Sequence, residues 1–130
     1  MKFSQRSVKC NVSAGQGNGL ADGARLGETP AMEHHVYFWL KDECKSAADR
    51  AVFEQGLTSL FEIGLVSGGR WAVPAAVMPR PVIDQSWDYA LTMQFASVAD
   101  HDAYQVHPQH NAFVETFKGW WAQVQVRDLA

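Results

Sequence analysis

Hydrophobic and polar side chains alternate clearly in residues 34–41, a segment rich in the β-branched and aromatic residues that favour strands. In an extended chain, successive side chains point to opposite faces. One face of this strand would carry His34, Val36, Phe38 and Leu40, and the other would carry His35, Tyr37 and Trp39. Both faces would therefore bear large apolar groups, which is unusual for a sheet that is wet on one side.

Apolar residues then recur at helical spacing after Ser46, which with Asp49 forms a capping signal at a helix start. The helical stripe consists of Phe53, Leu57, Leu60, Phe61 and Gly64. Gly64 and the cluster Ser67-Gly68-Gly69 would end the helix and turn the chain. A short strand is predicted at 70–76. Prolines place the segment 77–86 at an edge or in a loop.

The next strand is predicted at 87–95, because Trp87, Tyr89, Leu91, Met93 and Phe95 alternate with smaller or polar residues. Ser97 with Asp100 repeats the capping signal for a helix reaching about Val106. Pro108 suits the first turn of a further helix, where its missing N–H does no harm. That helix would bear an apolar stripe of Phe113, Phe117, Trp120, Trp121 and Val124, which we assign to the core. Residues 124–129 would close the domain as a strand.

The order β-α-β-β-α-β predicts an α+β, ferredoxin-like fold, with an antiparallel sheet and helices on one face. The uncovered face is normally polar. Here Tyr37 and Trp39 would lie on it, and an exposed apolar sheet face is a candidate interaction surface. We therefore expect a homodimer packed sheet to sheet. The alternative is a monomer in which residues 77–86 or the N-terminal segment cover these rings.

Composition separates residues 1–31 from the rest of the chain. This segment holds five of the ten glycines but one of the fifteen aromatic residues, and its glycines follow no strand or helix period. We expect a flexible arm at 1–31 and a folded domain at 32–130. Basic residues outnumber acidic ones in the arm, so both a transit peptide and a plain extension upstream of Met32 stay open.

Length and charge exclude several classes of protein. A chain of 130 residues argues for one folded domain, and a net charge of −3 argues against a nucleic-acid partner. No apolar run approaches the roughly 20 residues that a membrane span needs. With two cysteines, Cys10 and Cys44, and no secretory signal, we expect reduced thiols and a cytoplasmic location.

Four of the five histidines fall in two clusters, at 34–35 and 107–110. The second cluster completes the pattern Tyr-x-x-His-Pro-x-His at residues 104–110, which Phe113 and Trp121 follow. Together with His-x-Val-x-Phe-x-Leu-Lys at residues 34–41, this pattern resembles the stress-responsive A/B-barrel (Dabb) family. The resemblance spans about residues 32–129.

The resemblance implies a dimeric α+β barrel, in which two sheets pack together. We expect no cofactor. Many members of the family have no known activity, so we expect a homodimer that binds a small apolar or aromatic ligand in its barrel cavity. Some related plant proteins are polyketide cyclases, in which a base removes a C–H proton while a tyrosine holds a carbonyl in an aldol condensation. The matching positions, His34, Tyr104 and His110, are the catalytic candidates. The candidate ligand-binding residues are His107, Phe38, Trp87 and Leu91.

Other functions and roles stay open. Fold analogy alone suggests a cofactor-free monooxygenase. His34, His107 and His110 could bind a metal or haem weakly, but no nearby carboxylate completes a ligand set. Structural roles are equally available: His107 can cap a helix, His34 can hold a strand end, and His110 can pair with Tyr104. We expect His101, between Asp100 and Asp102, on a solvated face.

Overall fold

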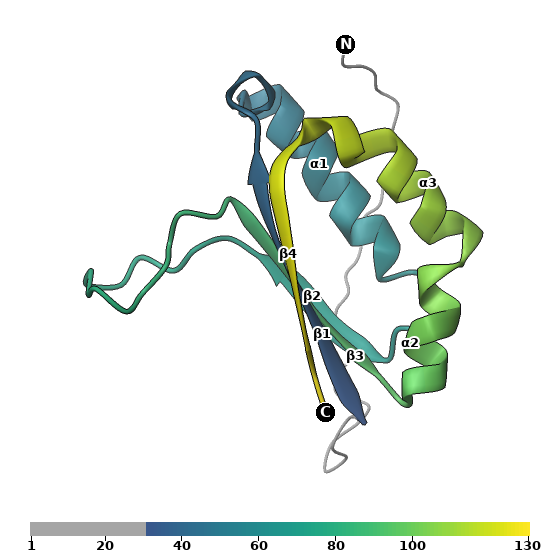
Figure 1. Cartoon of the computed structure of the whole chain (residues 1–130). Helices are drawn as coiled ribbons and strands as arrows, with labels where there is room; N and C mark the ends of the chain where they lie inside the picture. The colour runs from purple at the N-terminus through teal and green to yellow at the C-terminus, as the bar shows by residue number, and fades with distance from the viewer. Residues whose placement is uncertain (1–30) are drawn as a thin grey trace.

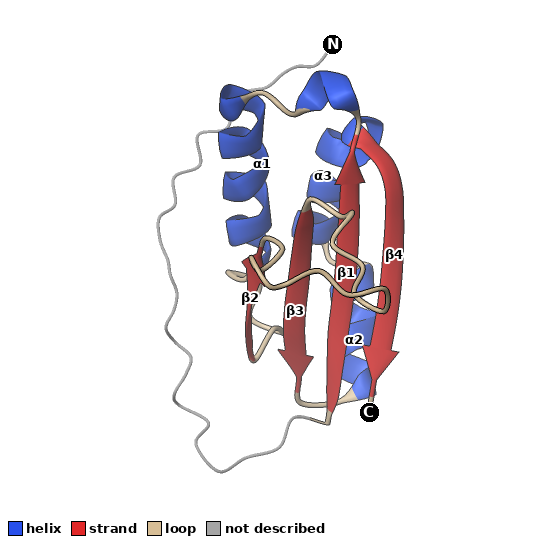
Figure 2. Cartoon of the chain, turned by 90° about the vertical axis from the view of Figure 1, so that its left-hand side faces the viewer, coloured by secondary structure: helices blue, strands red, loops and turns tan. Residues whose placement is uncertain are grey.

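The computed structural model describes residues 31–130, which form a four-stranded antiparallel sheet with helices on one face (Figures 1 and 2). The strands are β1 (Met32–Leu40), β2 (Gly68–Ala72), β3 (Tyr89–Phe95) and β4 (Trp121–Leu129), in the spatial order β2-β3-β1-β4. The helices are α1 (Ala47–Leu60), α2 (Val98–Gln105) and α3 (Pro108–Phe117), with short 3₁₀ helices η3 (Asp42–Cys44) and η4 (Lys118–Trp120). The predicted α+β, ferredoxin-like fold is confirmed.

The described residues do not test two of the predictions, the flexible N-terminal arm and the cytoplasmic location. Residues 1–30 lie outside the described part of the chain, so the arm expected at 1–31 stays a prediction. Among the helices described, none combines the length and the apolar character needed to cross a bilayer. The cytoplasmic location also stays a prediction.

The three helices begin where the polar residues predict. The hydroxyl of Ser46 accepts a hydrogen bond from the Asp49 N–H, and that of Ser97 accepts one from the Asp100 N–H, each at 3.0 Å. Each bond satisfies an amide that the first turn of a helix leaves without a partner. Pro108 opens α3 as expected. These caps fix the ends of α1 and α2 that lie next to the sheet.

The core lies between the helices and one face of the sheet. Residues of β1 are alternately buried and half-buried, with Val36, Phe38 and Leu40 on the helix side, as the period-two pattern predicts. Phe53 of α1 is fully buried at the centre. Its ring contacts those of Phe38, Tyr89, Phe113, Phe117 and Trp120, at centroid separations of 5.2–6.3 Å. Burying one such side chain contributes about 1.5–3 kcal/mol.

The second strand differs from its prediction at both ends. It spans Gly68–Ala72 instead of 70–76, so two of the glycines expected in the turn belong to the sheet. Gly69 has φ of +117°, and a Cβ at this position would collide with the carbonyl oxygen of Thr92 on β3. The close approach of two backbones, which only glycine permits here, explains why the strand starts early.

The last three residues of the predicted helical stripe lie outside the α-helix. Helix α3 ends at Phe117, Trp120 lies in η4, and Trp121 and Val124 belong to β4. The carbonyl of Trp120 accepts a hydrogen bond of 2.9 Å from the Lys41 N–H. This bond ties the chain to the end of β1, so the residues that follow pair with the sheet even though their spacing suits a helix.

Trp87 lies on the opposite side of the sheet from the predicted one. The strand begins at Tyr89, and Trp87 precedes it in the loop 73–88. Its ring packs against Tyr37, 5.4 Å away, on the face that the helices leave uncovered. The alternation that placed Trp87 with Tyr89 holds only inside a strand.

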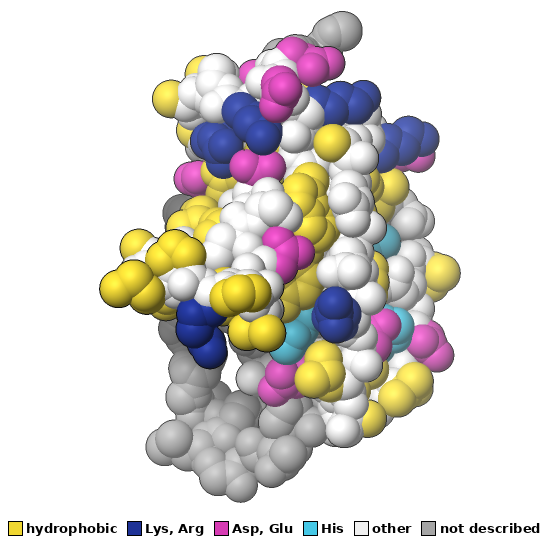
Figure 3. All heavy atoms as spheres, turned by 60° about the vertical axis from the view of Figure 1, so that its left-hand side comes forward, with side chains coloured by type: hydrophobic (Ala, Val, Ile, Leu, Met, Phe, Trp, Pro, Cys, Tyr) yellow, Lys and Arg dark blue, Asp and Glu magenta, His cyan; other side chains and the backbone are white. Residues whose placement is uncertain are grey.

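The loop 73–88 stands away from the uncovered face of the sheet (Figure 1). It carries the exposed side chains Val73, Val77, Met78 and Val82, and hydrophobic atoms gather there in Figure 3. Near its end, Ser86 accepts a hydrogen bond of 3.0 Å from the Trp39 indole. The loop therefore covers part of Tyr37 and Trp39 while exposing apolar groups of its own.

Candidate functional site

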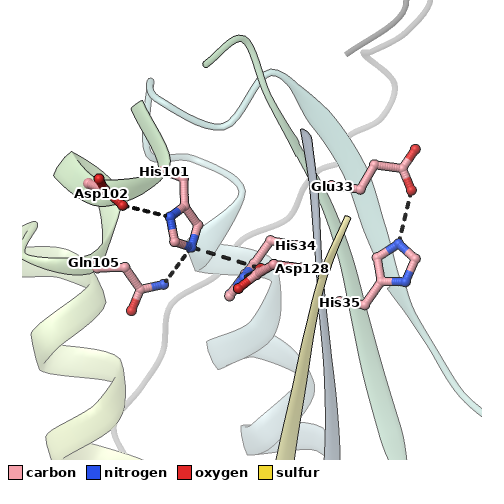
Figure 4. A network of polar contacts seen from close by, with 7 residues as sticks. All are labelled: Glu33, His34, His35, His101, Asp102, Gln105 and Asp128. Atoms are coloured by element: carbon pink, nitrogen blue, oxygen red, sulfur yellow. Dashed lines mark hydrogen bonds and ion pairs between the residues drawn. The ribbon is translucent and has the colours of Figure 1, made fainter. Parts of the chain in front are cut away.

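His34 is the one buried residue on the helix-facing side of β1 that can carry a charge, with 5% of its surface exposed. Its Nδ1 lies 2.6 Å from Oδ1 of Asp128, which is its register partner on β4 (Figure 4). Residues paired directly across antiparallel strands point to the same side. The sheet thus brings together two groups that lie at opposite ends of the domain's sequence.

His101 joins this pair from α2, and the expectation of a solvated face is wrong. Its side chain is 15% exposed, and its ring lies 5.0 Å from that of His34 and 5.6 Å from that of Phe95. Its Nδ1 is 3.0 Å from Asp102 and its Nε2 is 3.9 Å from Asp128. Figure 4 shows His101 between these two carboxylates. The neighbouring acids suggested solvent, but one turn of α2 packs this residue onto the sheet.

Tyr104 and His110 form the adjoining part of the site. Their ring centroids are 4.7 Å apart, and Tyr104 lies 6.1 Å from His34. Tyr104 is 1% exposed and also packs against Phe95. The structure therefore brings the three candidates His34, Tyr104 and His110 into one cluster, drawn from β1, α2 and α3.

One buried polar atom of this cluster lacks a hydrogen-bond partner within residues 31–130. The Nδ1 of His110 is buried without a hydrogen bond. The neighbouring Tyr104 hydroxyl has its pKa raised by burial, the one cause of that shift. Most buried polar groups in proteins are paired, so each exception asks for an explanation. A bound molecule that presents a carbonyl or hydroxyl group would satisfy this atom.

Burial sets the protonation of all three candidates. It lowers the pKa of His34, against the opposing effect of Asp128, and it lowers the pKa of His110. Both imidazoles are therefore largely neutral at pH 7 and able to accept a proton. Burial raises the pKa of the Tyr104 hydroxyl, which keeps its proton and can donate a hydrogen bond.

The four predicted ligand-binding residues do not gather around this cluster. His107 caps α3, since its Nδ1 accepts a hydrogen bond of 3.0 Å from the Gln109 N–H. Phe38 and Leu91 are each 2% exposed inside the hydrophobic core. Trp87 lies on the other face of the sheet, against Tyr37. These placements favour structural roles for all four within one chain.

The site opens to solvent along β4. The side chain of Asp128 is 43% exposed, compared with 6% for its partner His34. Val124 and Val126 pair in register with Phe38 and Val36, so they point to the helix side, yet they are 37% and 50% exposed. The helices therefore leave an apolar strip of β4 uncovered next to the polar cluster.

The side chains that could hold a metal ion also differ from the predicted set. Within the described range 31–130, the one group of three suitable donors is His34, His101 and Asp128, whose ligand atoms lie within 4.8 Å of one another. His107 and His110 are not part of it. Sequence reasoning missed His101 and Asp128, although the strand register that links Asp128 to His34 follows from pairing the first and last strands.

The sequence of the folded domain matches the model of a known protein family. The model of the family described as "Stress responsive A/B Barrel Domain" (Dabb) matches residues 32–130. No curated protein matches the chain significantly.

Solved structures share the fold at low identity. A Dabb family protein with a ferredoxin-like fold from Mesorhizobium loti is 24% identical, with a TM-score of 0.62 over 76% of this chain and 94% of the other. A dimeric ferredoxin-like protein of unknown function from Thermobifida fusca is 17% identical, with a TM-score of 0.61 over 76% and 89%. A hydroxynitrile lyase from Passiflora edulis is 18% identical, with a TM-score of 0.62 over 75% and 89%.

Proposed function

Because the chain belongs to the stress-responsive A/B barrel domain (Dabb) family, we propose that it binds a small apolar or aromatic carbonyl compound and catalyses proton transfer on it. The observation that carries this proposal is the pairing of Tyr104 with His110. Their ring centroids lie 4.7 Å apart, burial keeps the Tyr104 hydroxyl protonated, and the Nδ1 of His110 is buried without a hydrogen bond within residues 31–130. A donor and a base next to each other are what such a reaction needs.

His110 is the proposed base and Tyr104 the proposed donor. His110 removes a proton from a carbon next to a carbonyl group, and Tyr104 donates a hydrogen bond to the oxygen on which the negative charge develops. The resulting enolate carbon attacks a second carbonyl of the same molecule and forms a carbon–carbon bond. The new alkoxide then takes up the proton that His110 removed from carbon, which gives an intramolecular aldol product and returns His110 to its neutral form.

His34 forms the wall of the site on the sheet side. Asp128 holds its imidazole at 2.6 Å, and the ring of Tyr104 rests 6.1 Å from it. A neutral imidazole in this position offers a fixed polar group toward the substrate without a charge that would repel protonation of His110. The apolar strip of Val124 and Val126 supplies contact area for an apolar substrate.

The alternatives have less support. One structural neighbour is a hydroxynitrile lyase, but at 18% identity the similarity supports the fold alone and not a shared reaction. A cofactor-free monooxygenase rests on the same kind of analogy. No residue of the described part of the chain favours haem.

A turnover assay tests the catalytic proposal. The full chain is incubated with linear poly-β-ketones, and ring closure is followed by liquid chromatography against the spontaneous reaction. We expect His110→Ala to slow turnover by about 10²- to 10⁴-fold and Tyr104→Phe by about 10²- to 10³-fold. Thermal melts of both variants should stay near that of the wild type. The control is His35→Gln, which changes a histidine on the opposite face and should turn over normally.

Two results would contradict the proposal. One is a wild-type rate equal to the spontaneous rate for every substrate tested. The other is a His110→Ala variant that folds and retains the wild-type rate. If the turnover rates of His110→Ala and Tyr104→Phe fall only in proportion to the fraction of folded protein, the two residues have a structural role.

We also propose that the chain forms a homodimer through the uncovered sheet face. Tyr37 and Trp39 lie on this face and remain half-buried although the loop 73–88 covers part of them. Two structural neighbours, from Thermobifida fusca and Bacteroides fragilis, are described as dimeric. Light scattering at micromolar concentration should give twice the 14.4 kDa chain mass, and Tyr37→Arg should shift it toward one chain. A wild-type monomer would contradict the proposal.

A further inference from the structure

We propose that His34, His101 and Asp128 form a binding site for a divalent transition-metal ion. They come from three different elements, β1, α2 and β4, and their candidate ligand atoms all lie within 4.8 Å of one another (Figure 4). His34 lies on β1, an inner strand of the sheet, and His101 lies on α2, a helix that packs against the sheet. Two of the three ligands are therefore fixed by the fold, whether or not an ion is present.

The donor set identifies the class of metal. Two imidazole nitrogens and one carboxylate oxygen suit zinc, iron, cobalt, nickel and manganese, whereas magnesium and calcium prefer oxygen ligands throughout. Three protein ligands leave further coordination positions for water or a small molecule. Asp128 faces solvent on 43% of its side chain, which gives an entry path for the ion and for water.

A partner in the outer shell orients His101. The Nδ1 of His101 lies 3.0 Å from Oδ1 of Asp102. When Nδ1 donates its proton to that carboxylate, Nε2 is left with a lone pair that faces Asp128 at 3.9 Å. Two electron-rich atoms then face each other, an arrangement that a cation between them stabilises. A carboxylate bound to the far nitrogen is the usual support of a metal-binding histidine.

The remaining contacts allow an ion to enter. Gln105 approaches the same Nε2 at 3.5 Å, a weak contact that an ion can replace. With metal–ligand bonds of about 2.0–2.2 Å, neighbouring donor atoms lie about 3–3.5 Å apart. The 2.6 Å between His34 and Asp128 is a hydrogen-bond distance, so the carboxylate has to move by less than about 1 Å as the ion replaces the shared proton. The side chain of Asp128 is partly exposed, which leaves room for this movement.

The metal site does not depend on the proposed catalysis. It shares His34 with the wall of the proposed catalytic site but uses neither Tyr104 nor His110, and ion binding can be measured without a substrate. An ion held by His34 would lie next to Tyr104, whose ring contacts that of His34. Adding a chelator to the turnover assay separates the two proposals, because the Tyr104–His110 reaction needs no metal.

Metal titration of the full, chelator-treated chain tests the proposal. Cobalt(II) is followed by its visible absorption and zinc(II) by calorimetry. We expect one ion per chain, and no binding at this site in His101→Gln or Asp128→Asn. Asp102→Asn, which removes only the outer-shell partner, should weaken binding by about 10- to 100-fold.

His35→Gln is the matched control. His35 has a carboxylate partner, Glu33, at 3.0 Å, but on the other side of β1 and without a second histidine (Figure 4). This variant should bind as the wild type does. The proposal is overturned if the wild type binds neither ion, or if His101→Gln and Asp128→Asn bind as tightly as His35→Gln. Circular dichroism melts identify any variant that fails to fold. If one does, metal binding by His101→Gln, a substitution at the edge of the site, decides whether the proposal stands.

Discussion

The imidazole of His34 and the carboxylate of Asp128 are joined at 2.6 Å although 94 positions separate them in the sequence. The bond joins the first and last strands, so it forms only when β4 has paired with β1. Because His34 is buried and its partner is charged, the bond is worth more than an average neutral one.

Replacing Asp128 should therefore reduce stability. Asp128→Asn keeps the shape and an acceptor oxygen but loses the charge, and we expect a loss of about 1–2 kcal/mol in the free energy of unfolding. Urea denaturation at pH 7 in the presence of a chelator measures it. Asp102→Asn is the comparison, since Asp102 is 71% exposed and should change stability by less than about 0.5 kcal/mol. Equal effects of the two substitutions would show that the half-buried bond between His34 and Asp128 adds no stability beyond that of an exposed contact.

His107 should matter for stability more than for ligand binding. Its Nδ1 caps the first turn of α3, and removing a helix cap typically costs about 1 kcal/mol. His107→Ala should lower the melting temperature, and His107→Asn, which retains a capping acceptor, should restore most of the loss. If His107→Ala instead melts like the wild type but loses turnover, the residue belongs to the site after all.

The sequence predicts the sheet better than the site, for a physical reason. The face of β1 that carries Val36, Phe38 and Leu40 follows from a period of two within one strand. The resemblance to the Dabb family supplied the cluster of His34, Tyr104 and His110. Local patterns carry such information because strand geometry and family motifs are both short-range features of the chain.

His101 and Asp128 were missed because their environment depends on distant segments. Asp100 and Asp102 give His101 a polar neighbourhood in the sequence, while in the fold its ring packs on Phe95 and His34. Trp87 was misplaced for the opposite reason. Its spacing fits the alternation of β3, but it precedes the strand, where backbone direction is set by the loop and by contact with Tyr37.

The buried histidines should make stability depend on pH. Burial lowers the pKa of His110 from the ordinary 6.5, so the unfolded chain binds a proton at a higher pH than the folded chain does. This contribution to stability is complete above pH 6.5 and is lost as the pH falls toward the folded pKa. The melting temperature should therefore decrease between pH 7 and pH 5. It should decrease less in His110→Gln, which cannot titrate; a parallel decrease in both proteins would exclude His110 as the cause.

The close approach of β2 and β3 makes Gly69 the glycine that tolerates substitution least. Its φ of +117° is strained for any residue with a side chain, and a Cβ would meet the carbonyl of Thr92. The backbone strain alone costs about 1–3 kcal/mol, and the collision adds to it, so Gly69→Ala should separate the edge strand from the sheet.

Gly64→Ala is the control, because a Cβ at Gly64 meets no atom within 4 Å and its φ is not in the positive range. We expect that change to shift stability by less than about 1 kcal/mol in either direction. Urea denaturation of both variants decides the point, and amide hydrogen exchange at residues 68–72 shows whether the loss begins in β2. If Gly69→Ala unfolds at the same urea concentration as Gly64→Ala, the register of β2 against β3 differs from the one described here.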